Sequence, residues 1–205
     1  FSPSRALLTS QSARVSLSTL ACPAWSSSPV IDLRFEELPG KSTFVDSSGR
    51  GRDAVGTIGA SPDAGAAGAV LVAERSHFAA GFDDPSDELV IPNPIAPASN
   101  PVTNDLSIAF WYNASASDSA EPFVIADTDG GEFALEIRHD TGVVEFSDSR
   151  NQTANPVLVN DGEWHFIVAT VSDQGRLGLH VDGSATRGDG RETRPSIGST
   201  VKVST

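Results

Sequence analysis

The sequence contains one cysteine, Cys22, and no methionine. A single cysteine excludes an intrachain disulfide, and a zinc site built on thiolates needs several Cys or His residues at close spacing. We expect Cys22 to be an inert, buried thiol, with pairing between two chains as the alternative. Because a newly translated chain begins with methionine, a sequence that starts at Phe1 is expected to be a processed or partial chain.

Long apolar segments are also absent. A transmembrane helix needs about 18 or more consecutive apolar residues. The longest candidate, residues 64–73, is shorter than this and consists mainly of Gly and Ala. We therefore predict no membrane span in this chain.

Basic residues are few. The 14 Lys and Arg stand against 27 Asp and Glu, and the formal net charge is −13. Such a chain repels phosphate groups, which argues against binding to nucleic acid or to an anionic membrane surface. The acidic surface is expected to keep the protein soluble. The alternative is cation binding, because carboxylates in loops are ligands for Ca²⁺.

Short segments of alternating polarity make up most of the chain from residue 30 onward. In residues 106–112 every second residue is large and apolar, which indicates a strand with one buried face. Residues 133–137 repeat the pattern, and residues 163–171 are apolar on both faces, which predicts a strand buried on both sides. Turn residues recur about every 8–12 positions, as in sandwiches and barrels. Helical periodicity is nearly absent, so the fold class is all-β.

The first 28 residues have a different composition. They are rich in Ser, Thr and Ala, and they contain Arg5 and Arg14 but no acidic residue. We treat residues 1–28 as an N-terminal extension and residues 29–205 as one domain. Apolar and polar residues alternate at positions 15–17, so this part of the extension is either a strand or a solvated leader.

Six sequence segments follow one another in a characteristic order. They are LRFEE at 33–37, VDSSGRGRDA at 45–54, AGFDD at 80–84 with DELVIP at 87–92, DLSIAFWY at 105–112, NDGEWHF at 160–166 and LHVDG at 179–183. In this order they resemble the laminin-G-like domains of the concanavalin A-like lectin/glucanase superfamily, over roughly residues 30–200. The resemblance implies an antiparallel jelly-roll sandwich of two sheets. Phe110 and Trp164 are then expected to anchor its core.

The resemblance also implies a closing strand, which pairs in the middle of a sheet beside the opening strand. None is visible here between the RIGS-like segment at 196–199 and Thr205. A missing internal strand would leave backbone donors and acceptors unpaired. A longer chain could supply it, the extension around residues 14–20 could fill the gap in its own domain, or the extension of a neighbouring molecule could fill it and build a filament. We expect a fragment of a longer chain first and exchange between molecules second.

Catalytic signatures are missing. Glucanases of this fold use a Glu-x-Asp-x-x-Glu cluster, which does not occur here, and neither does a Gly-x-Ser-x-Gly nucleophile motif. None of the four histidines pairs with another at metal-ligand spacing. His165 and His180 could share one sheet surface and contact a ligand, although such residues are more often structural. We predict that the chain is not an enzyme.

Two further kinds of site are suggested by local sequence. Asp46 and Asp53 flank a glycine-rich turn, where they either bind Ca²⁺ at a rim site known in the family or cap the turn. Asn113 and Asn151 begin Asn-x-Ser/Thr tripeptides expected just beyond strand ends, so both are candidate N-glycosylation sites of a secreted eukaryotic protein.

These features predict a secreted or cell-surface module without catalytic activity. It would be a structural or adhesive component of a cell-surface or filamentous assembly, with a protein partner or self-assembly through the unpaired sheet position. The alternative is a lectin-like, calcium-dependent carbohydrate-binding domain of a larger protein. That reading needs exposed aromatic residues, and Tyr112 and Trp25 are the candidates.

Overall fold

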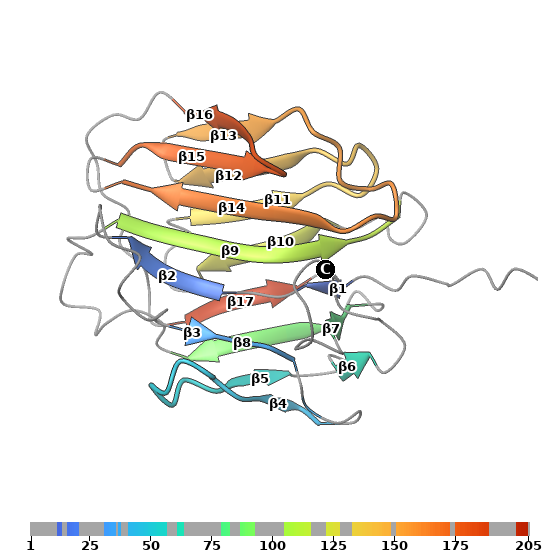
Figure 1. Cartoon of the computed structure of the whole chain (residues 1–205), viewed down its shortest axis with the longest axis vertical. Coiled ribbons are helices and arrows are strands. Elements are labelled where there is room, and N and C mark those ends of the chain that lie inside the picture. The colour runs from blue at the N-terminus through green and yellow to red at the C-terminus, as the bar shows by residue number, and fades with distance from the viewer. Residues whose placement is uncertain are drawn as a thin grey trace, which may run out of the picture.

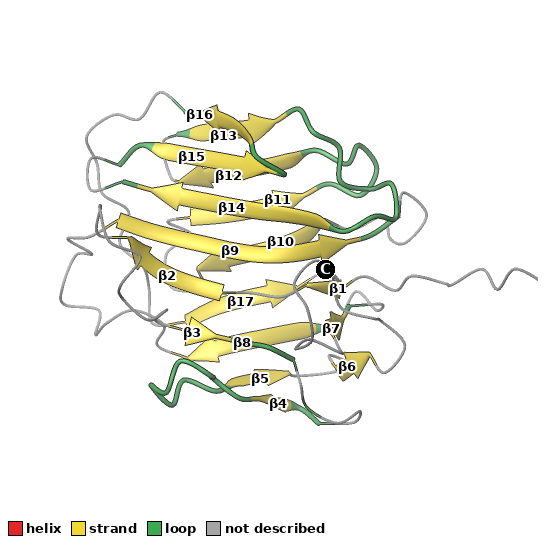
Figure 2. Ribbon diagram, viewed as in Figure 1, coloured by secondary structure: helices red, strands yellow, loops and turns green. Residues whose placement is uncertain are grey.

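A computed structural model describes much of the chain, and the residues that it describes are 12–13, 16–20, 31–35, 37, 41–56, 61–63, 79–82, 87–92, 105–115, 122–127, 133–148, 151–172, 175–188 and 200–204. Every regular element in these ranges is a β-strand (Figure 2). None of the described residues forms a helix that is long and apolar enough to cross a membrane. The predicted all-β class is confirmed.

The strands form two antiparallel sheets (Figure 1). The first sheet contains β1 (Ser12–Ala13), β2 (Ser16–Leu20), β3 (Ile31–Asp32), β6 (Ser61–Asp63), β7 (Ala79–Gly81), β9 (Asp105–Asn113), β14 (His165–Val171), β15 (Leu177–Val181) and β16 (Ser184–Arg187). The second contains β4 (Thr43–Phe44), β5 (Ala54–Gly56), β8 (Glu88–Pro92), β10 (Phe123–Asp127), β11 (Phe133–Ile137), β12 (Val144–Asp148), β13 (Gln152–Asn155) and β17 (Thr200–Ser204).

The core lies between the two sheets and is built by the alternation seen in the sequence. In β11 the residues Phe133, Leu135 and Ile137 are buried, while the residues between them are partly exposed. Because successive side chains of a strand point to opposite faces, one apolar face per strand is enough to fill a sandwich. Phe123 is the centre of an aromatic cluster, and its ring centroid lies 5.3 to 6.0 Å from those of its three neighbours, Phe82, Phe110 and Tyr112.

Two aromatic residues differ from their predicted positions. Phe110 is 1% exposed and lies in the core as expected, whereas Trp164 is only partly buried and does not belong to the core cluster. This corrects the expected anchor role of Trp164, which lies just before the first residue of β14. Tyr112, which we considered as an exposed ligand-binding residue, is fully buried and stacks on His139.

The strand β14 is buried on one face only, which corrects the expectation of burial on both. Its core face consists of His165, Ile167, Ala169 and Val171. On the opposite face, Phe166 is 38% exposed. An apolar face of the first sheet is therefore open to solvent beside β9.

The last strand of the chain was not anticipated from the sequence. Residues 200–204 form β17, which pairs with β10 on one side and β8 on the other and thus lies inside the second sheet. Val201 and Val203 point into the core, and Lys202 forms an ion pair with Glu88 at 2.6 Å on the outer face. The prediction that no strand follows the RIGS-like segment was wrong.

The N-terminal extension occupies the position beside the opening strand. β2 pairs with β9 on one side and with β3 on the other, and β1 pairs with β9 and β7 (Figure 1). The register against β9 is the same for both, since Ser12 lies opposite Asn113 and Leu20 lies opposite Asp105. In this arrangement β1 and β2 of the N-terminal extension fill an internal position of the first sheet, between β9 on one side and β7 and β3 on the other.

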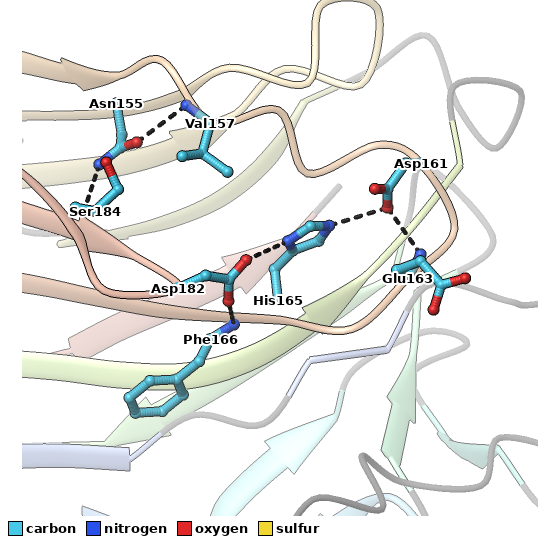
Figure 3. Close-up of polar contacts among 8 residues, drawn as sticks. All are labelled: Asn155, Val157, Asp161, Glu163, His165, Phe166, Asp182 and Ser184. Carbon is cyan, nitrogen blue, oxygen red and sulfur yellow. Dashed lines mark hydrogen bonds and ion pairs between the residues drawn. The ribbon is translucent and has the colours of Figure 1, made fainter.

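Polar contacts join the two sheets at one edge. Asn155, the last residue of β13, is fully buried, and its Nδ2 donates to the carbonyl oxygen of Ser184 at 3.0 Å (Figure 3). Its Oδ1 accepts a hydrogen bond from the backbone N–H of Val157 at 3.0 Å. A buried amide that is bonded on both sides fixes this edge, because leaving either group unpaired would cost about 1–3 kcal/mol.

Candidate binding site on the outer face of the first sheet

The outer face of β9, β14, β15 and β16 is organised in three rows by the strand register, since residues directly opposite each other in antiparallel strands share a face. The first row pairs Trp111 with Phe166. The second row runs through Ala109, Val168, His180 and Ala185, and the third runs through Ser107, Thr170, Gly178 and Arg187.

The first row forms an aromatic platform. The ring centroids of Trp111 and Phe166 are 5.0 Å apart, and their planes are inclined by 42°. Phe166 is 38% exposed and Trp111 is partly exposed, so both rings face solvent. Sequence reasoning missed this platform, because the alternation in residues 163–171 is apolar on both faces and does not tell which one is buried.

Polar groups of the second and third rows lie close to Gly178. A Cβ atom on Gly178 would lie 2.6 Å from the Oγ1 of Thr170 and 3.9 Å from the Nε2 of His180. The hydroxyl of Thr170 donates to the carbonyl oxygen of Gly178 at 3.4 Å. Glycine therefore leaves room for both side chains to meet beside Arg187, which is exposed at the opposite position of β16. Together with the aromatic platform, these residues form the outer-face site.

A second polar cluster lies at the start of β14, where His165 lies between two carboxylates (Figure 3). Its Nδ1 lies 2.7 Å from an Oδ atom of Asp182, and its Nε2 lies 3.0 Å from Oδ1 of Asp161. Asp182 also accepts the backbone N–H of Phe166 at 2.8 Å, and Asp161 accepts that of Glu163 at 2.9 Å. The cluster thus ties the loop before β14 to the turn between β15 and β16.

The carboxylates favour the charged form of the histidine. Burial opposes a charge on His165, but the hydrogen bonds to Asp182 and Asp161 outweigh it, and the pKa of His165 is raised. The hydrogen bond from His165, followed by that from the backbone of Glu163, lowers the pKa of Asp161. Both ring nitrogens are engaged, so neither is available to take a proton from a substrate, and we assign the cluster a structural role.

His165 and His180 do not share a surface, which corrects a possibility considered from the sequence. His165 is 7% exposed and lies on the core side of β14. His180 is partly exposed and lies opposite Val168 on the outer face. Only His180 belongs to the outer-face site.

The turn with Asp46 and Asp53 is closed by internal hydrogen bonds. Oδ1 of Asp46 accepts the backbone N–H groups of Asp32 and Ser48 at 3.1 and 2.9 Å, and Oδ2 accepts the hydroxyl of Ser48 and the N–H of Arg52 at 2.8 and 3.1 Å. Burial opposes the charge of Asp46, but these bonds dominate, and its pKa is lowered. Asp53 in turn accepts the N–H of Asp46 at 2.9 Å.

These hydrogen bonds fit the turn-cap role, which is one of the two roles considered for Asp46 and Asp53. N–H donors occupy the carboxylate oxygens that a cation would need, and the described residues contain no group of three or more His, Cys, Asp or Glu side chains able to hold a metal. Calcium binding by this protein stays a prediction.

The two candidate glycosylation sites differ in access. Asn113 is the last residue of β9 and only 3% exposed, and its Nδ2 donates to the carbonyl oxygen of Gly162 at 2.8 Å. The buried, hydrogen-bonded amide of Asn113 is less accessible to a glycan than an exposed one, and glycosylation of Asn113 stays a prediction. Asn151 is partly exposed between β12 and β13, where its backbone and side-chain N–H groups bond to Asp148. Glycosylation of Asn151 stays a prediction.

Two antiparallel sheets that enclose one core place this chain in the class of jelly-roll β-sandwiches. The family described as the concanavalin A-like lectin/glucanases superfamily, of the laminin G type, matches residues 83–203. The match covers more than half of the sequence, and the chain belongs to this superfamily. No curated protein matches the sequence.

Several solved structures share the fold. The binding domain of botulinum neurotoxin serotype D is similar with a TM-score of 0.59 and 17% identity, over 86% of this chain and 43% of that chain. A complex of the serotype D ligand-binding domain with N-acetylneuraminic acid has a TM-score of 0.55 and 15% identity, over 84% and 43%. The binding domain of Paraclostridial Mosquitocidal Protein 1 has a TM-score of 0.59 and 12% identity, over 86% and 44%. The chain spans less than half the length of these domains, and the likeness is one of fold.

Proposed function

We propose that the chain is an extracellular, non-catalytic adhesive module that binds carbohydrate on the outer face of its first sheet. The observation that carries the proposal is the solvent-exposed pair of Trp111 and Phe166. Small-ligand sites combine aromatic surface with a few placed polar groups. The apolar C–H face of a sugar ring packs on such a platform, while hydroxyl groups bond to neighbouring polar side chains such as Thr170 and His180.

The other parts of the proposal have separate support. The laminin-G-type family and the toxin binding domains of similar fold support an extracellular binding role. The absence of both catalytic motifs from the sequence supports a non-catalytic one. In one similar structure, the bound molecule is N-acetylneuraminic acid, which is a sugar.

We expect Phe166→Ala to weaken carbohydrate binding by roughly 10-fold, because losing the ring removes about 1.5 kcal/mol of apolar contact. The chain is first tested on an array of neutral and acidic oligosaccharides, and the strongest binder is then titrated by calorimetry against both proteins. Leu158→Ala is the matched control, since Leu158 is 53% exposed and lies outside the three rows. Absence of binding to any array member at millimolar concentration, or equal loss in both variants, would contradict the proposal.

Self-assembly by exchange of the N-terminal strand is the second candidate function. It is favoured by the internal position of β1 and β2, which pair on both sides within the first sheet. A neighbouring molecule could present the same strand to the same edges. Light scattering over a concentration series is expected to show dimers or longer assemblies if exchange occurs. A strict monomer at the highest concentration rejects this candidate.

A further inference from the structure

The outer face of β14, β15 and β16 differs in charge from the protein as a whole. The chain has a formal net charge of −13. At the outward positions of these three strands, however, the residues are Phe166, Val168, Thr170, Gly178, His180, Ala185 and Arg187, and none of them is acidic. Asp182, at the adjacent turn, is bound to His165 and to the backbone of Phe166. This part of the surface therefore favours an anion.

The guanidinium group of Arg187 is available to bind an anion. Two other arginines in the described ranges are paired, Arg34 with Asp32 at 2.9 Å and Arg138 with Glu136 at 3.3 Å. Arg187 is exposed and forms no ion pair with any residue that the structure describes. A guanidinium group presents a planar set of donors that matches a carboxylate with two parallel hydrogen bonds.

Geometry relates this cation to the aromatic platform. Phe166 and Thr170 are four residues apart on β14, which is about 13 Å along the strands. Arg187 lies two strands away from β14, which adds about 10 Å across the sheet. Arginine side chains extend several ångströms along a surface. A ligand that reaches both places is longer than one sugar ring. It passes His180 in the row between them, and Thr170 lies in the same row as Arg187.

We propose that the outer-face site binds an acidic oligosaccharide of two or three rings, with a sugar ring on Trp111 and Phe166 and a sugar carboxylate on Arg187. The inference rests on the proposed carbohydrate-binding function and names the ligand class. The ligand is short, because the net charge of −13 repels a long polyanion that extends beyond Arg187. At physiological salt this repulsion is screened beyond about 8 Å, so one carboxylate beside Arg187 experiences mainly the arginine.

The test compares two ligands that differ only in charge. A trisaccharide with one terminal uronic acid and its carboxyl-reduced, neutral counterpart are titrated by calorimetry into the wild-type chain, Arg187→Gln and Arg138→Gln. We expect the wild type to bind the acid about 10-fold more tightly than the neutral sugar. Arg187→Gln should abolish this preference, because the acid loses its partner and then binds no more tightly than the neutral sugar. Arg138→Gln, which lies outside the site, should keep both the preference and the wild-type affinities.

The outcomes separate this inference from the proposed function. Equal affinity of the wild type for both sugars, or a preference that persists in Arg187→Gln, overturns the acidic ligand and leaves carbohydrate binding intact. Failure of both sugars to bind, together with no binding on the array, overturns both.

Discussion

Deletion of residues 1–20 is expected to leave the chain unable to form a stable monomer. The deletion removes β1 and β2, which pair with β9 on one side and with β7 and β3 on the other. Each lost backbone hydrogen bond contributes about 1 kcal/mol, and a domain has a total stability of only about 5–15 kcal/mol. The exposed edges of β9, β3 and β7 would also promote association with other chains.

Circular dichroism and size-exclusion chromatography measure this effect. Deletion of residues 1–10 is the control, because it removes no described strand, and it should retain the wild-type denaturation midpoint. A synthetic peptide of residues 11–21 should restore part of the folded signal when it is added to the longer deletion. A soluble monomer with an unchanged midpoint after deletion of residues 1–20 would show that the strand is dispensable.

Replacement of His165 by glutamine is expected to lower stability by about 2 kcal/mol near pH 5.5. The histidine side chain is 9% exposed and forms hydrogen bonds with two carboxylates, Asp161 and Asp182. Glutamine carries no charge and cannot neutralise both acids at once. The side chains of Asp161 and Asp182 are 55% and 42% exposed, so water screens their interaction with the histidine. The expected loss of about 2 kcal/mol is therefore low for two hydrogen bonds to charged groups.

The same variant should change how stability depends on pH. The pKa of His165 is raised above its ordinary value of 6.5, so its contribution is complete below about pH 6.5 and is lost as the pH rises through the folded value. The pKa of Asp161 is lowered from 3.8, so its contribution is complete above that pH and is lost as the pH falls through the lower folded value. The cluster therefore stabilises the fold most between about pH 4 and 6.5.

Urea unfolding between pH 4 and 8.5 tests this dependence. The wild type should lose stability above pH 6.5 relative to its value at pH 5.5, and His165→Gln should lack most of that decrease. His180→Gln, on the opposite face of the sheet, should keep it. Parallel pH profiles for the wild type and His165→Gln would show that the two carboxylates do not hold the histidine in its charged form.

Much of the fold was predictable from local patterns. The alternation in residues 106–112 and 133–137 predicted β9 and β11, and Asp182 and Gly183 form a turn with positive φ angles of 49° and 85°. An Asp-Gly pair suits such a turn, because glycine adopts this backbone region without strain. The order of the six motifs indicated the superfamily, and the family that matches residues 83–203 confirms it.

The last strand was less predictable. Residues 200–204 have only two apolar side chains, Val201 and Val203, and this short alternation does not stand out in the sequence. It becomes a strand because β8 and β10, more than 70 residues upstream, offer an edge on either side. Pairing between strands this far apart in the sequence depends on the whole fold, so a local sequence pattern does not predict it.

By itself, the sequence determined the all-β class, the superfamily and the positions of the main strands, because alternation and turn chemistry are local properties. The tertiary structure alone decided which face of β14 is exposed, since both faces are apolar and only packing selects His165 and Ile167 for the core. It also buried the side chain of Asn113 and placed the N-terminal extension beside β9. Burial and strand pairing depend on residues distant in the chain, and the outer-face site exists because of them.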